Sequence, residues 1–324
     1  MNEELISRDT IWRRQYDSDR YARHLSQPEL DRRIRDVVLN LINLNPNAKL
    51  DFGQMKIDPD LFSNESTFWM ERTTHCLEEM KLRYGPYPAG WQRREILHSE
   101  TFPNFISELG QKAAKRLSSM GLKRGDVFIK FGKRTYMEPL YESGTLRIQP
   151  ATFFAKTDHN GAVRDDELRF KMSLALSRAE MVKLVTNPED VPSDAPDQRV
   201  DVDFQSPTDF WLYCVTNSVA PRLFVDFEAD SCVIIRDRSQ FRQMLAEAGM
   251  NRMGGSTMQQ GSAMYVDPLW PKTAEIFIPL VKHFGYSYQD EHRFYWLPAT
   301  PCPKVSYVDV QIGSLKNFSD LVVL

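Results

Sequence analysis

The chain has 324 residues, of which 42% are hydrophobic and 26% charged, and its formal net charge is −3. These values are ordinary for a soluble globular protein, and the length allows one large hydrophobic core or two modest ones. No window approaches 18 uncharged apolar residues, which argues against a membrane-spanning segment.

Two further features favour a cytoplasmic location. The N-terminal stretch MNEELISRDTIWRRQ is charged and lacks the apolar region of a secretory signal, so we expect none. The four cysteines are widely spaced and match neither a disulfide framework nor a zinc-binding pattern, and a reducing compartment is the simplest interpretation. They are Cys76, Cys214, Cys232 and Cys302.

The first ~120 residues are predicted to be helical. In SQPELDRRIRDVVLNLINLNP, Ser26 and Glu29 have the spacing of a capping box, and Pro28 suits a first helical turn. NESTFWMERTTHCLEEMKLRYGP predicts a second helix that stops at Gly85 and Pro86. TFPNFISELGQKAAKRLSSMG predicts a third, whose inward face consists of Phe102, Phe105, Ile106, Leu109, Ala113 and Leu117.

Arginines crowd the first 35 residues, and acidic residues are interleaved among them. A salt-bridged helical surface is the simpler interpretation of this pattern. A face for nucleic acid or for an acidic partner is the alternative, and composition leaves both open.

The pattern changes after Arg124. Strands are predicted in VFIKFG, TLRIQPATFFA, DFWLYCVT, SCVIIRD and KVSYVDVQIGSL, and RTYMEPLYESG predicts a short helix closed by Gly144. The Pro/Asp-rich segment 186–207 is predicted to be an exposed loop, and the Gly/Met/Gln-rich segment 250–264 a flexible connection. We therefore expect an α+β protein with a helical N-terminal region, residues 1–123, and an α+β domain rich in antiparallel strands, residues 124–324.

Basic residues and a hydroxyl-rich turn mark the first two places that could carry chemistry. Lys130, Lys133 and Arg134 stand at the end of an apolar strand and the start of a helix, which suits an anionic phosphate. Solvated cations at an exposed strand end are the alternative. The T-N-S sequence at 216–218 follows the strand WLYCV and would either hold a ligand or simply form the turn.

The third place is GYSYQDEHRFYWLP, residues 285–298, where a polar run precedes the predicted strand 294–297. If the strand begins early, Gln289 and Glu291 point to the same side. Neighbouring aromatic rings would then bury Glu291 and make its charge consequential. The alternative is an edge-strand ion pair between Glu291 and Arg293 or Lys282.

The order of these three places resembles the mono-ADP-ribosyltransferases. In that family a basic residue on the first strand, a Ser/Thr-rich strand end and a late E-x-E or Q-x-E surround NAD. The stretch IKFGKRTYMEPLYESGTLRIQPATFF is similar to the family's strand–helix–strand opening, and QDEHRFYWLP to the strand that the late glutamate opens. Lys130 replaces the usual Arg or His, and T-N-S replaces S-T-S. The resemblance spans residues 124–324 and implies a mixed, mostly antiparallel split β-sheet.

The resemblance also implies residue roles. Glu291 would be the catalytic carboxylate that stabilises positive charge on the ribose of NAD, and Gln289 would orient the acceptor. Lys130 would bind the pyrophosphate of NAD, with Lys133 or Arg134 as the fallback. Thr216 and Ser218 would support the glutamate and the nicotinamide ribose. An aromatic ring would stack on the nicotinamide, and the candidates are Phe153, Phe154 and Tyr288.

A second similarity concerns the biological setting. The stretch YQDEHRF is similar to a Y-x-E-x-E-x-R stretch in a widespread bacterial family whose members often accompany phage-defence and toxin loci. The two similarities together imply a toxin or phage-defence effector that modifies RNA or a protein. An antitoxin and a chaperone are the candidate partners.

Two other functions are compatible with the sequence. AVRDDELRFK supplies Asp165, Asp166, Glu167 and Lys171, which could hold Mg²⁺ and position water in a nuclease or phosphoesterase, although a solvated loop is the plainer interpretation. In a non-enzymatic adaptor, the N-terminal helices would bind a partner and the C-terminal domain would be a degenerate scaffold. The identity of the acceptor stays open.

Overall fold

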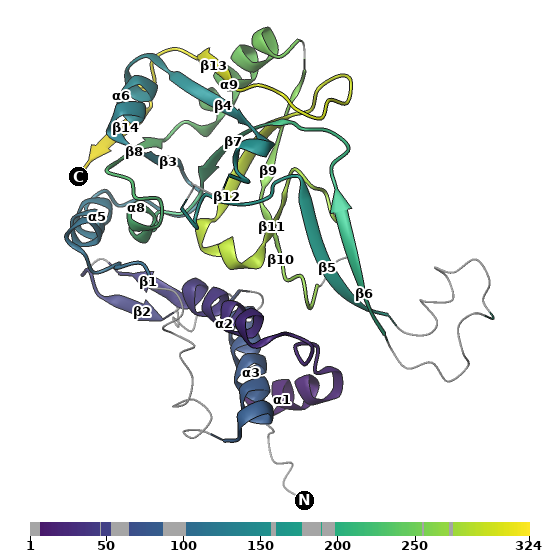
Figure 1. Cartoon of the computed structure of the whole chain (residues 1–324). Helices are drawn as coiled ribbons and strands as arrows, with labels where there is room; N and C mark the ends of the chain where they lie inside the picture. Colours follow the sequence, from purple (N-terminus) through teal and green to yellow (C-terminus); the bar gives the residue numbers. More distant parts are fainter. Residues whose placement is uncertain are drawn as a thin grey trace, which may run out of the picture.

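The computed structural model describes residues 7–45, 47–52, 65–86, 102–156, 160–176, 189, 198–254, 256–271 and 275–324. In these ranges helices dominate the N-terminal part, and a largely antiparallel eight-stranded sheet dominates the rest (Figure 1). The predicted α+β class is therefore confirmed. Within the same ranges, every helix is too short or too polar to cross a lipid bilayer.

The N-terminal part contains the first two predicted helices. Its elements are α1 (Arg8–Asp19), α2 (Gln27–Leu41), β1 (Ile42–Leu44), β2 (Leu50–Phe52), α3 (Glu65–Tyr84) and α5 (Glu108–Ser118). The backbone N–H of Ser26 donates to the Glu29 carboxylate at 2.7 Å, so the predicted capping box is present. Helix α3 ends before Gly85, whose φ is +87°.

Two local predictions in this part are wrong. Helix α5 begins after Ser107, because the Ser107 hydroxyl accepts from the N–H of Gly110 and caps the helix there. The predicted inward residue Ile106 consequently lies outside the helix and is 53% exposed. The β1–β2 hairpin interrupts the predicted helical region, because the Asn45 side chain accepts from the N–H groups of Asn47 and Lys49 and closes a turn.

The eight-stranded sheet divides at β7. Its strands are β3 (Phe128–Gly132), β4 (Thr145–Pro150), β7 (Trp211–Thr216), β8 (Ser231–Ile235), β9 (Met258–Ser262), β12 (Glu291–Trp296), β13 (Val308–Gln311) and β14 (Ser319–Val323). One edge of β7 pairs with β12, which pairs in turn with β9. Two strands share the other edge of β7: β4 pairs with the start of β7, and β3 pairs with its end. Beyond β4 the sheet continues with β13, and beyond β3 it continues with β8 and then β14.

Two segments predicted to be irregular are strands. Strand β6 (Gln198–Gln205) pairs with β5 (Arg169–Leu176), so the exposed-loop prediction is wrong for residues 198–205. Its apolar residues alternate, as in Val202 opposite Met172 and Phe204 opposite Phe170. Residues 186–188 and 190–197 of that prediction lie outside the described ranges. Strand β9 pairs with β12, so the predicted flexible connection is also wrong there.

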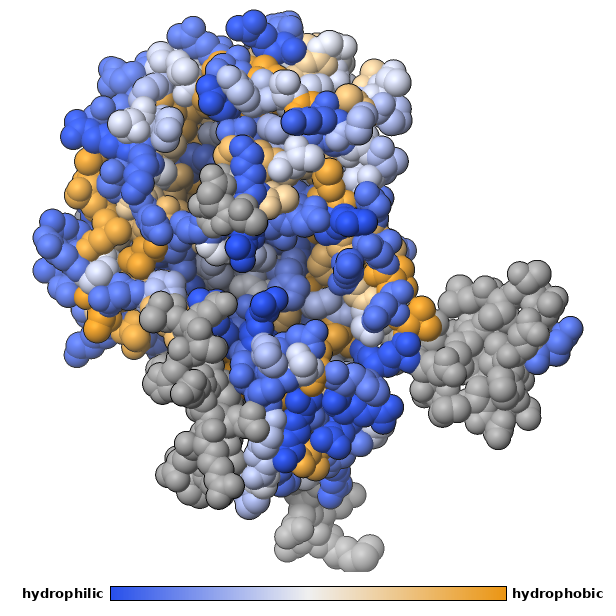
Figure 2. Space-filling view, in the orientation of Figure 1, coloured by the Kyte–Doolittle hydropathy of each residue, from blue (hydrophilic) through white to orange (hydrophobic). Residues whose placement is uncertain are grey.

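Helices and hairpins cover the two faces of the sheet. Helices α6 (Arg134–Ser143) and α9 (Arg238–Arg252) pack on the face that includes Phe294 and Trp296. The opposite face is covered by α5 and α8 (Arg222–Asp226), and by β5, β6, β10 (Met264–Val266) and β11 (Val281–His283). Because side chains alternate along a strand, Glu291, Arg293 and Tyr295 point to this opposite face. Figure 2 shows that hydrophilic side chains dominate the drawn surface and that exposed apolar side chains form separate small groups.

The N-terminal helices pack directly on the sheet domain. Leu117 of α5 shares a hydrophobic cluster with Ile129 of β3. Arg33 of α2 forms a buried ion pair with Asp267 at 2.8 Å. The Arg222 guanidinium donates to the carbonyl of Ile42 at 2.5 Å. Two 3-10 helices complete the described elements, η2 (Ala151–Phe153) and η4 (Phe284–Gln289), and η4 packs against α2.

Candidate functional site

Glu291 lies where three neighbouring strands meet. Helix η4 ends at Gln289, and Asp290, with φ +45°, turns the chain into β12, whose first residue is Glu291. In the sheet register Glu291 pairs with Thr216 of β7, and Thr216 pairs with Ile129 of β3. The strands that carry the three sequence-predicted places are therefore side by side, in the order β3, β7, β12.

The Glu291 carboxylate is buried and fully paired. Lys282 Nζ lies 2.8 Å from its Oε2, and Arg293 Nε lies 2.8 Å from its Oε1. Glu291 is only 6% exposed. Burial alone would raise the pKa of Glu291, but the charges of Arg293 and Lys282 outweigh it and hold the pKa well below its usual range. Glu291 is therefore ionised at neutral pH, and the ion pairs with Arg293 and Lys282 that the sequence offered as the alternative are both present.

Glu167 belongs to the same network. Arg293 Nη2 lies 2.8 Å from Glu167 Oε2, and Lys282 Nζ lies 3.6 Å from Glu167 Oε1. We call these four buried side chains, Glu167, Lys282, Glu291 and Arg293, the Glu291 network. Two carboxylates and two cations balance, and the remaining Arg293 N–H groups donate to the carbonyls of Pro279 and Val281. The four charges therefore compensate one another within the protein.

A cavity of about 220 Å³ opens beside the Glu291 network. Its walls include Asp165, Asp166, Glu167, Lys171, Lys282 and His283. Burial, with the neighbouring Glu167 charge adding to it, raises the pKa of Asp165 to about 7. Asp165 therefore exchanges a proton near neutral pH, whereas Glu291 stays ionised. Carboxyl groups held in two protonation states are the usual equipment of an acid–base site.

The residues named by two competing hypotheses from the sequence thus lie next to each other in the structure. The acidic stretch 165–167, predicted for a metal-dependent enzyme, contacts the late glutamate predicted for an ADP-ribosyltransferase, through Arg293 and Lys282. The sequence does not predict the contact between Glu167 and Arg293, because the two residues are 126 positions apart. Sequence reasoning also missed Tyr265, whose hydroxyl accepts from the backbone N–H of Glu291 at 2.8 Å.

Lys130 and Glu291 lie on opposite faces of the sheet. Ile129 pairs with Thr216 and shares the face of Glu291, so the next residue, Lys130, points to the other face. There Lys130 Nζ lies 4.7 Å from the centre of the Tyr213 ring and donates to the carbonyl of Cys214 at 2.7 Å. Burial lowers the pKa of Lys130. The strands are neighbours, but the structure does not bring the ammonium and the carboxylate into one pocket.

Gln289 and the T-N-S turn hold the backbone before β12. Gln289 is the last residue of η4 rather than a strand residue, and its Nε2 donates to the carbonyl of Ala162 at 2.8 Å. The Thr216 hydroxyl donates to the carbonyl of Gln289 at 2.5 Å and accepts from the N–H of Ser218 at 2.8 Å. Thr216 and Ser218 therefore form the turn, which was the structural interpretation of this stretch.

The remaining predicted NAD-binding residues are dispersed. Lys133 Nζ donates to the carbonyl of Glu228, and exposed Arg134 pairs with Glu138 at 2.5 Å. The rings of Phe153 and Tyr288 each lie against a cation: Lys156 Nζ is 4.7 Å from the first ring, and the Arg222 guanidinium 4.1 Å from the second. These side chains do not surround the Glu291 carboxylate.

The chain was compared with protein families, with characterised proteins and with solved structures. No family model matches it, and neither a curated protein nor a solved structure matches it.

Proposed function

We propose that this protein is an NAD-dependent mono-ADP-ribosyltransferase whose reaction centre is Glu291 and the adjoining cavity. The observation that carries the proposal is that Lys282 and Glu167, both members of the Glu291 network, line one cavity together with Asp165, a carboxyl whose pKa burial raises to about 7. Further support comes from the sheet, because the three strands named by the family resemblance are neighbours.

The two carboxyl groups would divide the chemistry. The bond between C1 of the ribose and the nicotinamide nitrogen breaks, and its electron pair leaves with the nicotinamide. Glu291 would stabilise the positive charge that develops on the ribose, as carboxylates do in glycoside cleavage. An oxygen or nitrogen of the acceptor then bonds to C1, and its proton passes to the ionised form of Asp165.

The size of the cavity limits what it would hold. At about 220 Å³ it is smaller than the roughly 300–1,000 Å³ of most ligand pockets, so it has room for one end of NAD only. In this proposal the ribose and nicotinamide enter the cavity, and the adenosine part lies along the protein surface.

The test compares three variants incubated with radiolabelled NAD and cell lysate. Glu291→Gln should lower transfer by roughly 10²–10³, the usual effect of removing one catalytic electrostatic group. Glu167→Gln disturbs the same ion pairs but keeps Glu291, so it should lose far less. Glu247→Gln, on the exposed face of α9, is the matched control and should be fully active. Equal losses in Glu291→Gln and Glu167→Gln would show that the network is only structural.

One observation favours a second function, a non-enzymatic adaptor. Both oxygens of Glu291 are already engaged by cations, as in a purely structural network. A ligand that binds only the folded state raises the melting temperature, so millimolar NAD should stabilise a transferase and leave an adaptor unchanged. The metal-dependent alternative has no comparable support, since no three His, Cys, Asp or Glu side chains of the described ranges gather as metal ligands.

A further inference from the structure

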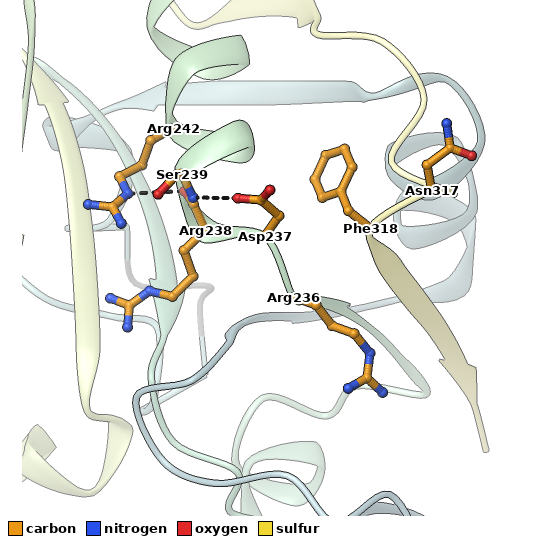
Figure 3. A pocket seen from close by; sticks show the side chains of 7 residues that line it. All are labelled: Arg236, Asp237, Arg238, Ser239, Arg242, Asn317 and Phe318. Atoms are coloured by element: carbon orange, nitrogen blue, oxygen red, sulfur yellow. Dashed lines mark hydrogen bonds between the residues drawn. The ribbon is translucent and has the colours of Figure 1, made fainter.

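A shallow cleft of about 730 Å³ lies at the first turn of α9, away from the Glu291 network. Its walls, which we call the arginine cleft, include Arg236, Asp237, Arg238, Arg242, Asn317 and Phe318. Figure 3 shows Arg238 and Arg242 extending to the same side of the helix, while Asn317 and Phe318 come from the segment that leads into β14. Three arginines face one aspartate, so the cleft is cationic.

Two of the arginines have no direct ion pair with a described residue. Arg236 pairs with Asp320 at 2.6 Å, but neither Arg238 nor Arg242 forms an ion pair with any described residue. Arg238 donates to the carbonyl of Gly125, and Arg242 Nε donates to the carbonyl of Arg238 at 3.0 Å. Arg238 Nε is buried and has no hydrogen-bond partner within the described ranges. Burial and the repulsive charge of Arg242 lower the pKa of Arg238, and the charges of Asp290 and Asp126 offset this only in part.

The free donors of the cleft belong to side chains and not to the helix backbone. The N–H groups of Ser239 and Gln240 already donate to Asp237 Oδ1 at 3.0 and 2.9 Å. Guanidinium groups match the oxygens of a phosphate and bind it with two parallel hydrogen bonds. An anion placed between Arg238 and Arg242 would relieve their repulsion and pair both.

The other walls of the cleft suit a nucleobase. The half-exposed Phe318 offers an aromatic face for stacking, and the exposed Asn317 amide offers both a donor and an acceptor. Phosphate-binding cations next to an aromatic platform are the combination by which proteins hold single-stranded nucleic acid. The cleft is shallow, which favours a strand lying across it over an enclosed small molecule.

The arginine cleft lies at the same end of the sheet as Glu291. Ile235, the residue before Arg236, pairs with Phe128 at the start of β3, and β3 pairs with the end of β7 beside Glu291. Three interstrand steps of about 4.8 Å separate β8 from β12, or about 15 Å in all. The Arg238 guanidinium covers the Phe128 ring at 4.1 Å, on the face of the sheet opposite to the Glu291 carboxylate, so a bound strand would pass around this end of the sheet to reach the Glu291 site.

We propose that the arginine cleft binds the phosphates of a single-stranded nucleic acid, and that this strand is the acceptor for the Glu291 site. The second clause rests on the proposed transferase function, whereas the first does not.

Binding is tested without NAD, so the result is independent of transferase activity. The probe is a fluorescein-labelled oligouridylate of about twelve nucleotides, followed by anisotropy at several salt concentrations. Arg242→Gln should weaken binding about tenfold and reduce the slope of log K against log salt by about 0.7. The matched control, Arg252→Gln, removes the same charge from the exposed last turn of α9 and should bind like the wild type. Equal losses in the two variants, or no binding by the wild type at low salt, would overturn the proposal.

Two further comparisons test the kind of ligand. Phe318→Leu preserves apolar packing but removes the stacking surface, and should weaken single-strand binding about tenfold. Uridine monophosphate should compete only at far higher concentration than the unlabelled strand. Competition at equal concentration, or equal affinity for duplex RNA, would contradict a single-strand site.

Discussion

Arg293 neutralises two buried carboxylates at once, so its removal is the most direct test of the Glu291 network. The guanidinium is fully buried, lies 2.8 Å from an oxygen of Glu291 and 2.8 Å from an oxygen of Glu167, and also donates to two carbonyls. Arg293→Met keeps a long apolar side chain but leaves both carboxylates to Lys282. One buried negative charge then has no partner.

The expected cost follows from that uncompensated charge. Breaking a buried ion pair by removing one partner typically costs about 3–5 kcal/mol, which is a large share of the roughly 5–15 kcal/mol that stabilises most proteins. Equilibrium urea unfolding at pH 7 measures the loss. The control is Arg147→Met, since Arg147 pairs with Asp309 on the surface, is 49% exposed and should contribute less than about 1 kcal/mol.

Two additional measurements separate charge from packing. Loss of the cation lets a buried carboxylate take up a proton, so the destabilisation by Arg293→Met should shrink as the pH falls. Glu167→Gln combined with Arg293→Met restores the charge balance, so the double variant should be more stable than the sum of the single changes predicts. Additive losses, or a cost below about 1 kcal/mol, would refute the reasoning that these charges are buried together.

Three further predictions follow from single residues. The pKa of Asp165 is raised to about 7, so the folded chain holds this proton to a higher pH than the unfolded chain, and the group removes stability as the pH rises from about 4 to 7. The melting temperature of Asp165→Asn relative to the wild type should increase over that range and level off above it, whereas a constant difference would contradict the raised pKa. At Gly144, with φ +68°, a Cβ would lie 2.1 Å from the carbonyl oxygen of Gly313, while at Gly254, with φ +60°, it would meet nothing within 4 Å. Gly254→Ala should therefore cost only the roughly 1–2 kcal/mol of left-handed backbone and Gly144→Ala clearly more in urea unfolding, so that equal costs would disprove the close approach. The Asn40 side chain accepts from the N–H of Tyr288 at 2.7 Å and donates to the carbonyl of Gly285 at 2.9 Å, which joins α2 to η4. Asn40→Ala should cost about 1–3 kcal/mol by calorimetry, and a loss no greater than that of the exposed Asn317→Ala would show that the junction is unimportant.

Local sequence signals anticipated several elements well. The capping box at Ser26, the stop at Gly85 and the left-handed Gly144 that closes α6 each depend on residues within one or two turns of each other. Such features are set by backbone geometry and nearby hydrogen bonds. The strands around Phe128, Trp211 and Ser231 were anticipated for a similar reason, because apolar β-branched and aromatic runs favour the extended chain.

Strands β6 and β9 escaped prediction because their stability comes from their partners. Val200, Val202 and Phe204 lie in a Pro/Asp-rich context, and β9 has the sequence MQQGS, which has little intrinsic preference for a strand. Pairing with β5 and β12 supplies the hydrogen bonds that make these segments extended.

The candidate site divides in the same way. From the sequence alone, Glu291 could be identified as a carboxylate at the start of an apolar strand, with Lys282 and Arg293 as its candidate ion-pair partners. The fourth member of the network, Glu167, is brought to Arg293 by tertiary packing, and the opposite orientations of Lys130 and Glu291 come from the sheet register. Register is fixed by pairing between strands far apart in the chain, and a shift of one residue would turn every side chain to the other face, so no local pattern contains it.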